Sequence, residues 1–356
     1  MARKLQWLEV MRGAAACWVL LYHANESVIV FVSPSGGQGA LFKNGSLGVD
    51  FFFVLSGFII AYSCNRLLAS GRGFADYLSA RLVRIYVPYL PAGIGILCLY
   101  ALFPHLSASA RVPGVFTSLT LLPSAHPPAL GVAWTLLHEI IFYAFFSVIF
   151  FSRTALWLLM AAWVVAIGWC ASQGIPLTLG QGLEPLLAPI NLLFPLGVAV
   201  YYAIRNGVSQ RVAVAAVAVG AVVVPAEACL SQPNRWLLAL GFAAFVVAAS
   251  SAWAQRWQPP RWLLLLGTAS YSIYLIHAAT VSICVRIFRR FLPDAGPFVS
   301  FIGFAVLGLA AGLLYYFVYE RHALAIVRRA LAARRDDGGA GGIDAPISQP
   351  QRETVK

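Results

Sequence analysis

Charged residues are scarce in this chain of 356 residues. Only 11% are Asp, Glu, Lys or Arg, and 60% are hydrophobic. A soluble domain carries about a quarter charged residues, because it must present a polar surface to water. The composition therefore argues against a soluble domain and predicts an integral membrane protein.

Acidic residues are scarcer still. The chain has 13 Asp and Glu against 25 Lys and Arg, which gives a net charge of +12. In a soluble protein this excess would favour nucleic-acid binding, but in a membrane protein basic residues collect in the cytoplasmic loops. No basic patch is interleaved with aromatic residues on a polar surface, so we expect no nucleic-acid partner.

Cysteine is infrequent, and none of the six cysteines forms a C-x-x-C pair. The pattern predicts neither a metal site nor a disulfide framework, and buried free thiols are the expected state. A cleavable leader is not expected either. Arg3 and Lys4 precede an apolar run, but this run continues from about Val10 to Val32 without a convincing cleavage site. This indicates a retained first helix.

Long apolar stretches are abundant. A bilayer core of about 30 Å needs about 20 apolar residues per helix, and ten stretches meet or approach this length. We predict an all-α integral membrane protein, a bundle of about ten transmembrane helices. The predicted spans are 8–31, 46–65, 86–105, 129–151, 155–172, 185–204, 211–229, 235–254, 262–285 and 298–320. Pro88, Pro91 and Gly95 interrupt the third span, which is the least regular.

The distribution of Lys and Arg predicts the orientation, because cytoplasmic loops carry the excess of both residues. On this rule both termini are cytoplasmic. The cluster of Arg286, Arg289 and Arg290 lies on the opposite side and runs against the rule. Residues 1–330 form the predicted transmembrane domain. The polar segment 331–356 is rich in Gly and is predicted to be a disordered cytoplasmic tail.

Two ionisable residues interrupt the first span in "MRGAAACWVLLYHA". Arg12 and His23 are eleven positions apart, about 20° beyond three full helical turns, so they project from one face. A charge inside the membrane costs at least about 2.5 kcal/mol, so function is the default explanation. The alternatives are a cytoplasmic anchor for Arg12 and an interhelical hydrogen bond for His23. The small residues at 13–16 would allow close approach of another helix or a ligand.

The fourth span contains a histidine and a carboxylate in "AWTLLHEIIFYAFF". An unpaired Glu139 would be very costly there, so it needs a cation, a histidine or a bound ligand. A structural ion pair is the alternative. His138 points about 100° away from Glu139 on a helix, so the two residues need not share a partner.

The second span begins with "GVDFFFVLSGFII". Asp50 lies near its start, where a carboxylate can stabilise a helix N-terminus, and this role is as reasonable as a functional one. Ser56 and Gly57 form a small polar spot in a helix otherwise rich in Phe. We count Asp50 and Ser56 as candidate supporting residues.

Paired arginines occur in "YLSARLVRIYVPYL", just before the predicted third span. Arg81 and Arg84 are i and i+3 neighbours on one helical face of the cytoplasmic side. Each guanidinium can bind phosphate oxygens with two hydrogen bonds, so the pair suits a phosphorylated ligand. Binding of lipid headgroups is the alternative.

A polar stripe occurs in "GTASYSIYLIHA". Tyr271, Tyr274 and His277 are spaced i, i+3 and i+6, so they share one broad helical face. This stripe either lines a cavity or makes interhelical hydrogen bonds. Tyr271 and His277 are further candidate supporting residues.

Five of these pieces occur in the order seen in one family, and the chain resembles the membrane acyltransferase-3 family over about residues 5 to 320. The pieces are "RGAAACWVLLYH", "GVDFFFVLSGF", "RLVRIYVPY", "WTLLHEIIFY" and "SYSIYLIH". The "WTLLHE" form is similar to exopolysaccharide-type members. The resemblance implies O-acylation of a bacterial glycan by a multi-pass protein of the cytoplasmic (inner) membrane.

The resemblance also implies roles for individual residues. His23 matches the catalytic histidine proposed for the family, Arg12 its paired arginine, and Glu139 an acidic residue of the fourth motif. Arg81 and Arg84 match a basic motif thought to bind the acyl donor. His138 stands where many members have a second acidic or another polar residue, which leaves its role and that of Glu139 open.

We therefore expect transfer of an acyl group, most simply acetyl, from acetyl-CoA as co-substrate to a hydroxyl of a glycan or lipid-linked saccharide. No tightly bound cofactor and no metal are expected. His23 could act as general base or accept the acyl group itself, and Glu139 could orient it. The alternative is a transporter or flippase for a lipid-linked sugar or a proton-coupled solute, because such proteins also need intramembrane ionisable residues.

Overall fold

The computed structural model describes residues 6–103, 113–174 and 184–339. Within these residues every regular element is a helix and no strand occurs. This confirms the predicted all-α class. The reason is that a backbone in lipid must satisfy its own hydrogen bonds, and a helix does so within one segment.

Eight helical segments of the described residues are long and apolar enough to cross a membrane. Five of them are single helices: α1 (Gln6–Phe31), α4 (Phe74–Leu102), α7 (Arg153–Ser172), α10 (Gln210–Ala228) and α13 (Ser270–Phe291). The other three are α3 (Gly48–Ala69) with the 3-10 turn before it, α6 (Trp134–Ser147) with its flanking turns, and α14 (Pro297–Tyr315) with its C-terminal continuation.

Two shorter apolar helices occupy the remaining predicted spans. They are α9 (Leu193–Ile204) and α11 (Arg235–Ala249). The count of ten crossings and the cytoplasmic location of the termini stay predictions.

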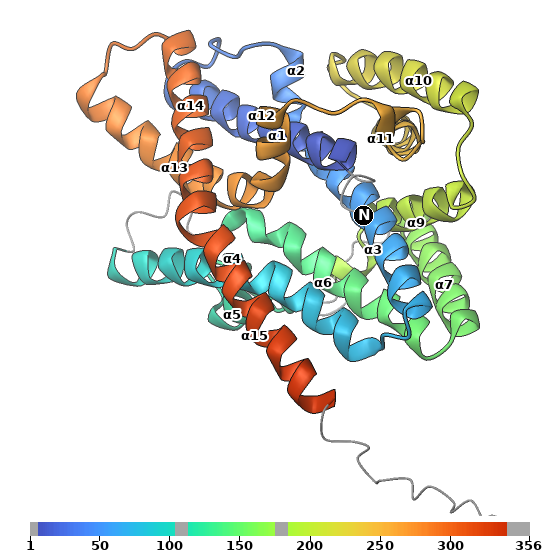
Figure 1. Ribbon diagram of the computed structural model, residues 1–356. Helices are drawn as coiled ribbons and strands as arrows, with labels where there is room; N and C mark the ends of the chain where they lie inside the picture. Colours follow the sequence, from blue (N-terminus) through green and yellow to red (C-terminus); the bar gives the residue numbers. More distant parts are fainter. Residues whose placement is uncertain (1–5, 104–112, 175–183, 340–356) are drawn as a thin grey trace, which may run out of the picture.

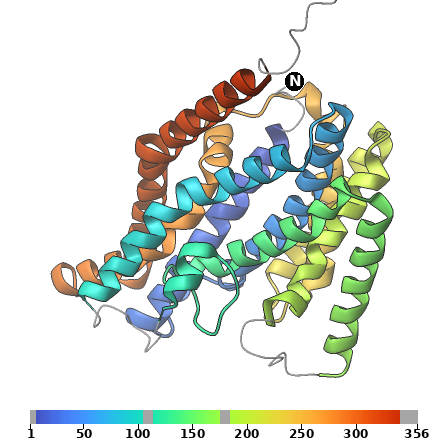
Figure 2. The same cartoon turned by 90° about the horizontal axis from the view of Figure 1, so that it is seen from below.

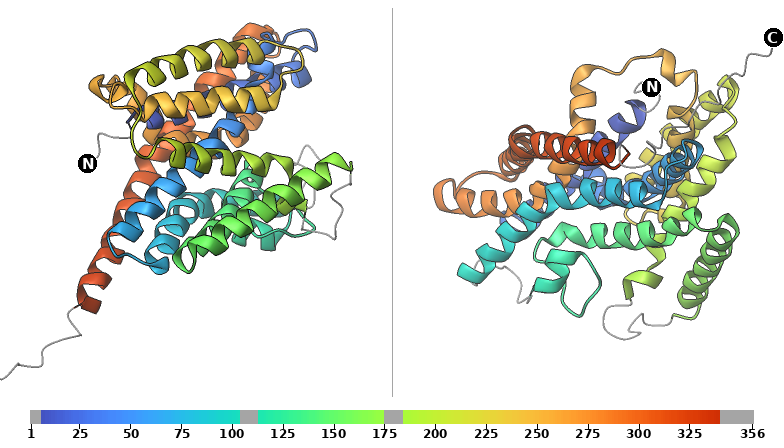
Figure 3. Two further views of the ribbon diagram at one scale, coloured as in Figure 1. Left: turned by 90° about the vertical axis from the view of Figure 1, so that its right-hand side faces the viewer. Right: turned by 60° about the horizontal axis from the view of Figure 1, so that its bottom comes forward.

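The helices form two groups with α3 between them (Figure 1). One group contains α1, α12, α13 and α14, and the other contains α4, α6 and α7. α3 packs against both α1 and α6, and α9 and α11 cover it from a third side. The antiparallel pair α10–α11 lies at the edge of the molecule (Figure 3). Segments distant in sequence thus meet around α3.

The predicted start of the third span was wrong. α4 begins at Phe74 rather than near residue 86, and it continues past Pro88 and Pro91. A proline leaves the carbonyl four residues earlier without its helical partner, and no water replaces that partner in a membrane. Three tyrosine hydroxyls donate hydrogen bonds to carbonyls of this stretch: Tyr271 to Ile85 (3.1 Å), Tyr319 to Val87 (3.1 Å) and Tyr315 to Pro88 (2.7 Å). The Val87 carbonyl is the one that Pro91 leaves without its helical partner, so Tyr319 replaces that partner, and the other two hydrogen bonds tie neighbouring turns of α4 to α13 and α14.

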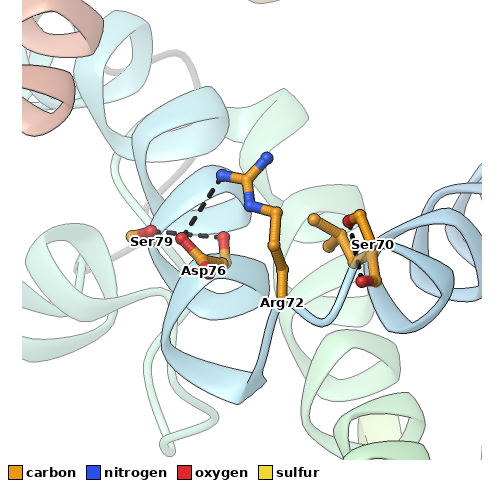
Figure 4. A network of polar contacts seen from close by, with 5 residues as sticks. Ser70, Arg72, Asp76 and Ser79 are labelled. Atoms are coloured by element: carbon orange, nitrogen blue, oxygen red, sulfur yellow. Dashed lines mark hydrogen bonds and ion pairs between the residues drawn. The ribbon is translucent and has the colours of Figure 1, made fainter. Parts of the chain in front are cut away.

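A short turn joins the end of α3 at Ala69 to the start of α4 at Phe74. Arg72 and Asp76 form an ion pair of 3.3 Å in it, and the Ser79 hydroxyl donates to the Asp76 carbonyl (Figure 4). The Arg72 side chain is largely exposed, so this pair contributes little stability. Because α4 begins directly after this turn, Arg81 and Arg84 lie within α4 instead of before it.

The predicted span 262–285 is divided. The helix breaks at Ala269 into α12 (Arg261–Thr268) and α13. α13 also extends further than predicted, so that Arg289 and Arg290 lie in its last turn. Cations are stabilised at a helix C-terminus, which gives a physical reason for basic residues that violate the charge rule.

The C-terminal helix α15 (Arg321–Gly339) follows α14 through a π-helical turn and lies alongside α4 (Figures 2 and 3). It runs past residue 331, where the disordered tail was predicted to begin. Residues 340–356 lie outside the described residues, so that part of the prediction is not tested.

Glycines bring α3 and α9 into backbone contact. A Cβ atom at Gly197 would lie 1.9 Å from the Val54 carbonyl oxygen, and one at Gly57 would lie 2.1 Å from that of Phe194. Small residues of this kind are what allow membrane helices to approach closely. The crossing tolerates no side chain at either position.

We expect Gly197→Ala to lower the free energy of unfolding by about 1–3 kcal/mol, because the methyl group must push the two backbones apart. Thermal unfolding in detergent measures the loss. The matched control is Gly168→Ala on α7, where no atom lies within 4 Å of the added Cβ. Equal unfolding midpoints for the two variants would contradict the close packing.

Candidate active site

A polar pocket lies where α1, α3, α4, α6 and α13 converge. It encloses about 720 Å³ of empty space, including its opening. Six of the predicted site residues line it: Arg12, Ser56, Arg81, Arg84, Glu139 and Tyr271. The structure therefore brings together residues that are up to about 260 positions apart in the sequence.

The three arginines of this pocket differ in their environment. Arg12 donates a hydrogen bond of 3.1 Å to the Ser270 hydroxyl on α13. Arg84 is half-buried and makes no hydrogen bond or ion pair with any described residue. A guanidinium without a hydrogen-bond or ion-pair partner keeps its N–H donors available for an anion such as a carboxylate or a phosphate.

Arg81 is held by the protein itself. Only 9% of it is exposed. It donates to the Ser63 hydroxyl, and its guanidinium carbon lies 5.8 Å and 5.6 Å from the ring centres of Tyr77 and Tyr143. The two arginines are therefore not equivalent: Arg81 has protein partners, whereas the guanidinium of Arg84 has no hydrogen-bond or ion-pair partner among the described residues.

Glu139 lines the same pocket. The Tyr143 hydroxyl donates to its Oε1 atom, and the Ser56 hydroxyl lies 3.4 Å from that atom. No cation of the described residues lies within ion-pair distance of Glu139. Its interaction with the arginines is therefore through space, and it offsets part of their positive charge.

His23 does not line the pocket, but it lies close behind it. Its ring centre is 5.0 Å from that of His277, and the His277 ring centre is 5.7 Å from that of Tyr274. Tyr274 lines the pocket and shares a hydrogen bond of 3.0 Å with Thr135. No hydrogen bond joins Glu139 to His23, so the expected orienting contact between them is absent from the described residues.

The predicted common face of Arg12 and His23 is confirmed. Arg12 contacts Ser270 and His23 contacts His277, and both partners lie on α13 two turns apart. The neighbouring small residues admit a helix rather than a ligand. A Cβ at Gly13 would lie 2.7 Å from the backbone nitrogen of Gly267 in α12.

Three of the predicted supporting residues do not line the pocket: His277, which neighbours His23, and also His138 and Asp50. His138 is buried, with its Nδ1 atom 2.8 Å from the Oδ1 atom of Asn191. Asp50 is 1% exposed, and its Oδ2 atom lies 2.8 Å from Nε of Arg235 on α11. His138 and Asp50 thus have structural partners on other helices, and neither lines the pocket with Arg12 and Arg84.

We expect Arg235→Gln to destabilise the protein by about 1–3 kcal/mol, because it leaves the Asp50 carboxylate buried without its cation. The loss is smaller than for a fully buried pair, since 46% of the Arg235 side chain is exposed. Thermal unfolding of the single variants and of Asp50→Asn/Arg235→Gln checks this. The double variant should recover much of the loss, and strictly additive losses would contradict a direct pair.

The sequence patterns missed some residues of the site. Tyr143 lies one helical turn after Glu139, and the i, i+4 spacing was the available signal. Glu320 is buried, accepts a hydrogen bond from Ser272 and interacts electrostatically with Arg12 and Arg84. Glu320 lies in the π-helical turn Tyr316–Glu320. Such turns are frequent at functional sites, but no local sequence pattern predicted this one. Among the described residues no group of three His, Cys, Asp or Glu could hold a metal ion.

Two comparisons with known proteins give a match to the chain. The profile of the acyltransferase-3 family, described as an acyltransferase domain, matches residues 5–317. The exopolysaccharide production protein ExoZ of Rhizobium meliloti (strain 1021) is 33% identical over 135 residues, which cover 36% of this chain and 38% of that protein. The match thus spans less than half the length of this relative. No solved structure shows a significant match to the chain.

Proposed function

Because the chain belongs to the acyltransferase-3 family, we propose that it is an O-acyltransferase that moves an acyl group from a CoA thioester to a hydroxyl of a glycan. The acyl group is most simply acetyl. The relative's name refers to exopolysaccharide production, which supports a cell-surface or secreted polysaccharide, or its lipid-linked precursor, as acceptor. We place the protein in the cytoplasmic membrane of a bacterium.

The pocket arginines carry this proposal. CoA bears several phosphates, and charge-assisted hydrogen bonds from guanidinium groups are among the strongest contacts for them. Arg84 has no hydrogen-bond or ion-pair partner among the described residues, and Arg12 has only one neutral hydroxyl partner. Arg81 keeps its protein partners and holds this wall of the pocket in place.

The reaction needs a base for the acceptor hydroxyl. In the proposed step the hydroxyl oxygen attacks the thioester carbonyl, the C–S bond breaks, and His23 passes the hydroxyl proton to the departing thiolate. In the second form of the mechanism His23 takes the acyl group as the C–S bond breaks and the CoA thiolate departs; the hydroxyl oxygen then takes the acyl group from His23, and the hydroxyl proton neutralises the thiolate. Both forms require the acyl group to reach His23, whose ring neighbours that of His277, which in turn neighbours Tyr274 of the pocket lining.

A radiolabel experiment tests the proposal. The purified protein in nanodiscs is incubated with acetyl-CoA labelled in the acetyl group and with a glycan extract of the source cells. We expect alkali-labile label on the glycan, and none without protein. Absence of label with several acyl-CoA donors would contradict the proposal. Movement of a lipid-linked saccharide across proteoliposomes without any acyl donor would instead support the transporter alternative.

A further inference from the structure

The buried histidine behind the pocket has a defined tautomer. His277 is 0% exposed, and its Nδ1 atom lies 3.1 Å from the carbonyl oxygen of Ile273, one turn earlier on α13. A carbonyl oxygen only accepts hydrogen bonds, so Nδ1 carries the hydrogen atom. The Nε2 atom of the neutral ring is then an acceptor.

This acceptor has no hydrogen-bond partner in the part of the chain that the structure describes. A buried polar atom without a partner costs about 1–3 kcal/mol, and such an atom in a native protein calls for an explanation. Because Nδ1 is bound to the backbone of α13, the Nε2 side of the ring is turned away from that backbone. The ring centre of His277 lies 5.0 Å from that of His23 on α1 and 5.7 Å from that of Tyr274.

Of these two neighbours, His23 is the one with an uncommitted donor. The Tyr274 hydroxyl is already shared with the Thr135 hydroxyl and lies 3.4 Å from the Val132 carbonyl. His23 is half-buried and makes no hydrogen bond to another described residue. An N–H group of its imidazole therefore complements the unpaired Nε2 atom.

We propose that His277 is a positioning residue for His23: when the neighbouring imidazole of His23 turns one ring N–H group toward it, the unpaired Nε2 atom of His277 accepts a hydrogen bond from that group. This bond fixes the tautomer and the orientation of His23 and leaves its second ring nitrogen free to take a proton or an acyl group. A carboxylate does the same for the histidine of a catalytic triad. The kinetic consequence rests on the proposed function, whereas the tautomer consequence does not.

A neutral partner suits this location. A carboxylate at position 277 would be fully buried and would cost several kcal/mol of desolvation before it met any cation. A neutral imidazole acceptor avoids that cost and still stabilises the charge that develops on His23. No proton moves to His277: the proton that His23 takes from the hydroxyl leaves with the thiolate.

Two variants of similar size separate this role from simple packing. In His277→Gln the side-chain oxygen can reach the place of Nε2 and accept a hydrogen bond, whereas in His277→Asn the amide reaches only the place of Nδ1. We expect His277→Asn to lower kcat about 10–100-fold with an unchanged KM for acetyl-CoA, since misplaced catalytic groups cost about 100-fold. His277→Gln should retain most of kcat. Equal loss in both variants, or loss in neither, would overturn the inference.

Nitrogen-15 NMR of histidine-labelled protein gives a readout that does not require turnover. The chain has only six histidines, so their signals can be assigned by substitution. We expect one tautomer for His23 in the wild type and in His277→Gln, and a mixture in His277→Asn. The exposed His126 provides the control, because His126→Asn should leave the His23 signals unchanged. Unchanged His23 signals in His277→Asn would refute the inference, whereas an inactive wild type would refute the proposed function alone.

Discussion

His23→Ala is expected to lower kcat for acyl transfer by about 10²–10⁴-fold, the range that a positioned general base contributes. The substitution removes the imidazole that takes the acceptor's proton in the proposed step. The KM for acetyl-CoA should change little, because His23 does not line the arginine pocket. Steady-state kinetics with labelled acetyl-CoA in nanodiscs measures both constants.

Two controls keep this result interpretable. His126→Ala removes an exposed histidine and should leave both constants unchanged. The thermal unfolding midpoint of His23→Ala should stay close to that of the wild type, since His23 is only half-buried and makes no hydrogen bond to a described residue. Full activity in a folded His23→Ala protein would remove His23 from the chemistry. Rapid-quench isolation of an acylated wild-type protein would favour the nucleophilic form of the mechanism.

Arg84→Glu should raise the KM for acetyl-CoA about 10–100-fold and leave kcat nearly unchanged. The reason is that charge-assisted hydrogen bonds are worth about 1.5–3 kcal/mol and every 1.4 kcal/mol is tenfold in affinity. A phosphate-free donor, the acetyl thioester of pantetheine, is the matched substrate control. Its KM should be the same for the wild type and for Arg84→Glu.

The neighbouring arginine provides the matched variant. Arg81→Gln should lower the free energy of unfolding, because it removes the contacts to Ser63 and to the rings of Tyr77 and Tyr143. Its effect on the KM for acetyl-CoA should be smaller than that of Arg84→Glu. If Arg84→Glu leaves the KM for acetyl-CoA unchanged, Arg84 does not bind the donor phosphates. If the KM for the pantetheine thioester rises equally, the variant has distorted the pocket instead.

Local sequence patterns were sufficient for those features that depend on one helix at a time. The scarcity of charge and the long apolar stretches predicted the helical membrane class, because a buried backbone and a bilayer impose both. The spacing of Arg12 and His23 predicted one common face, because 3.6 residues per turn is a property of any α-helix. Both residues do contact α13.

Partners between helices were not readable in this way. Glu139 accepts a hydrogen bond from Tyr143 rather than from His23, Asp50 pairs with Arg235, and His138 meets Asn191. Nor did any local pattern indicate that Tyr271 of α13, Tyr315 at the end of α14 and Tyr319 of the π-helical turn donate hydrogen bonds to carbonyls near the prolines of α4.

The sequence by itself therefore determined the membrane class, the helical faces and the candidate groups, whereas the tertiary structure decided which of these groups meet. Helical periodicity is local and sets the direction of each side chain around its own axis. Contact between side chains of two helices also depends on the distance between the helix axes and on where along the axes the helices cross. Glycines permit the close crossing of α1 with α12 at Gly13 and Gly267, and that of α3 with α9 at Gly57. A polar group buried among the helices can then bind only those protein groups that this packing brings within reach.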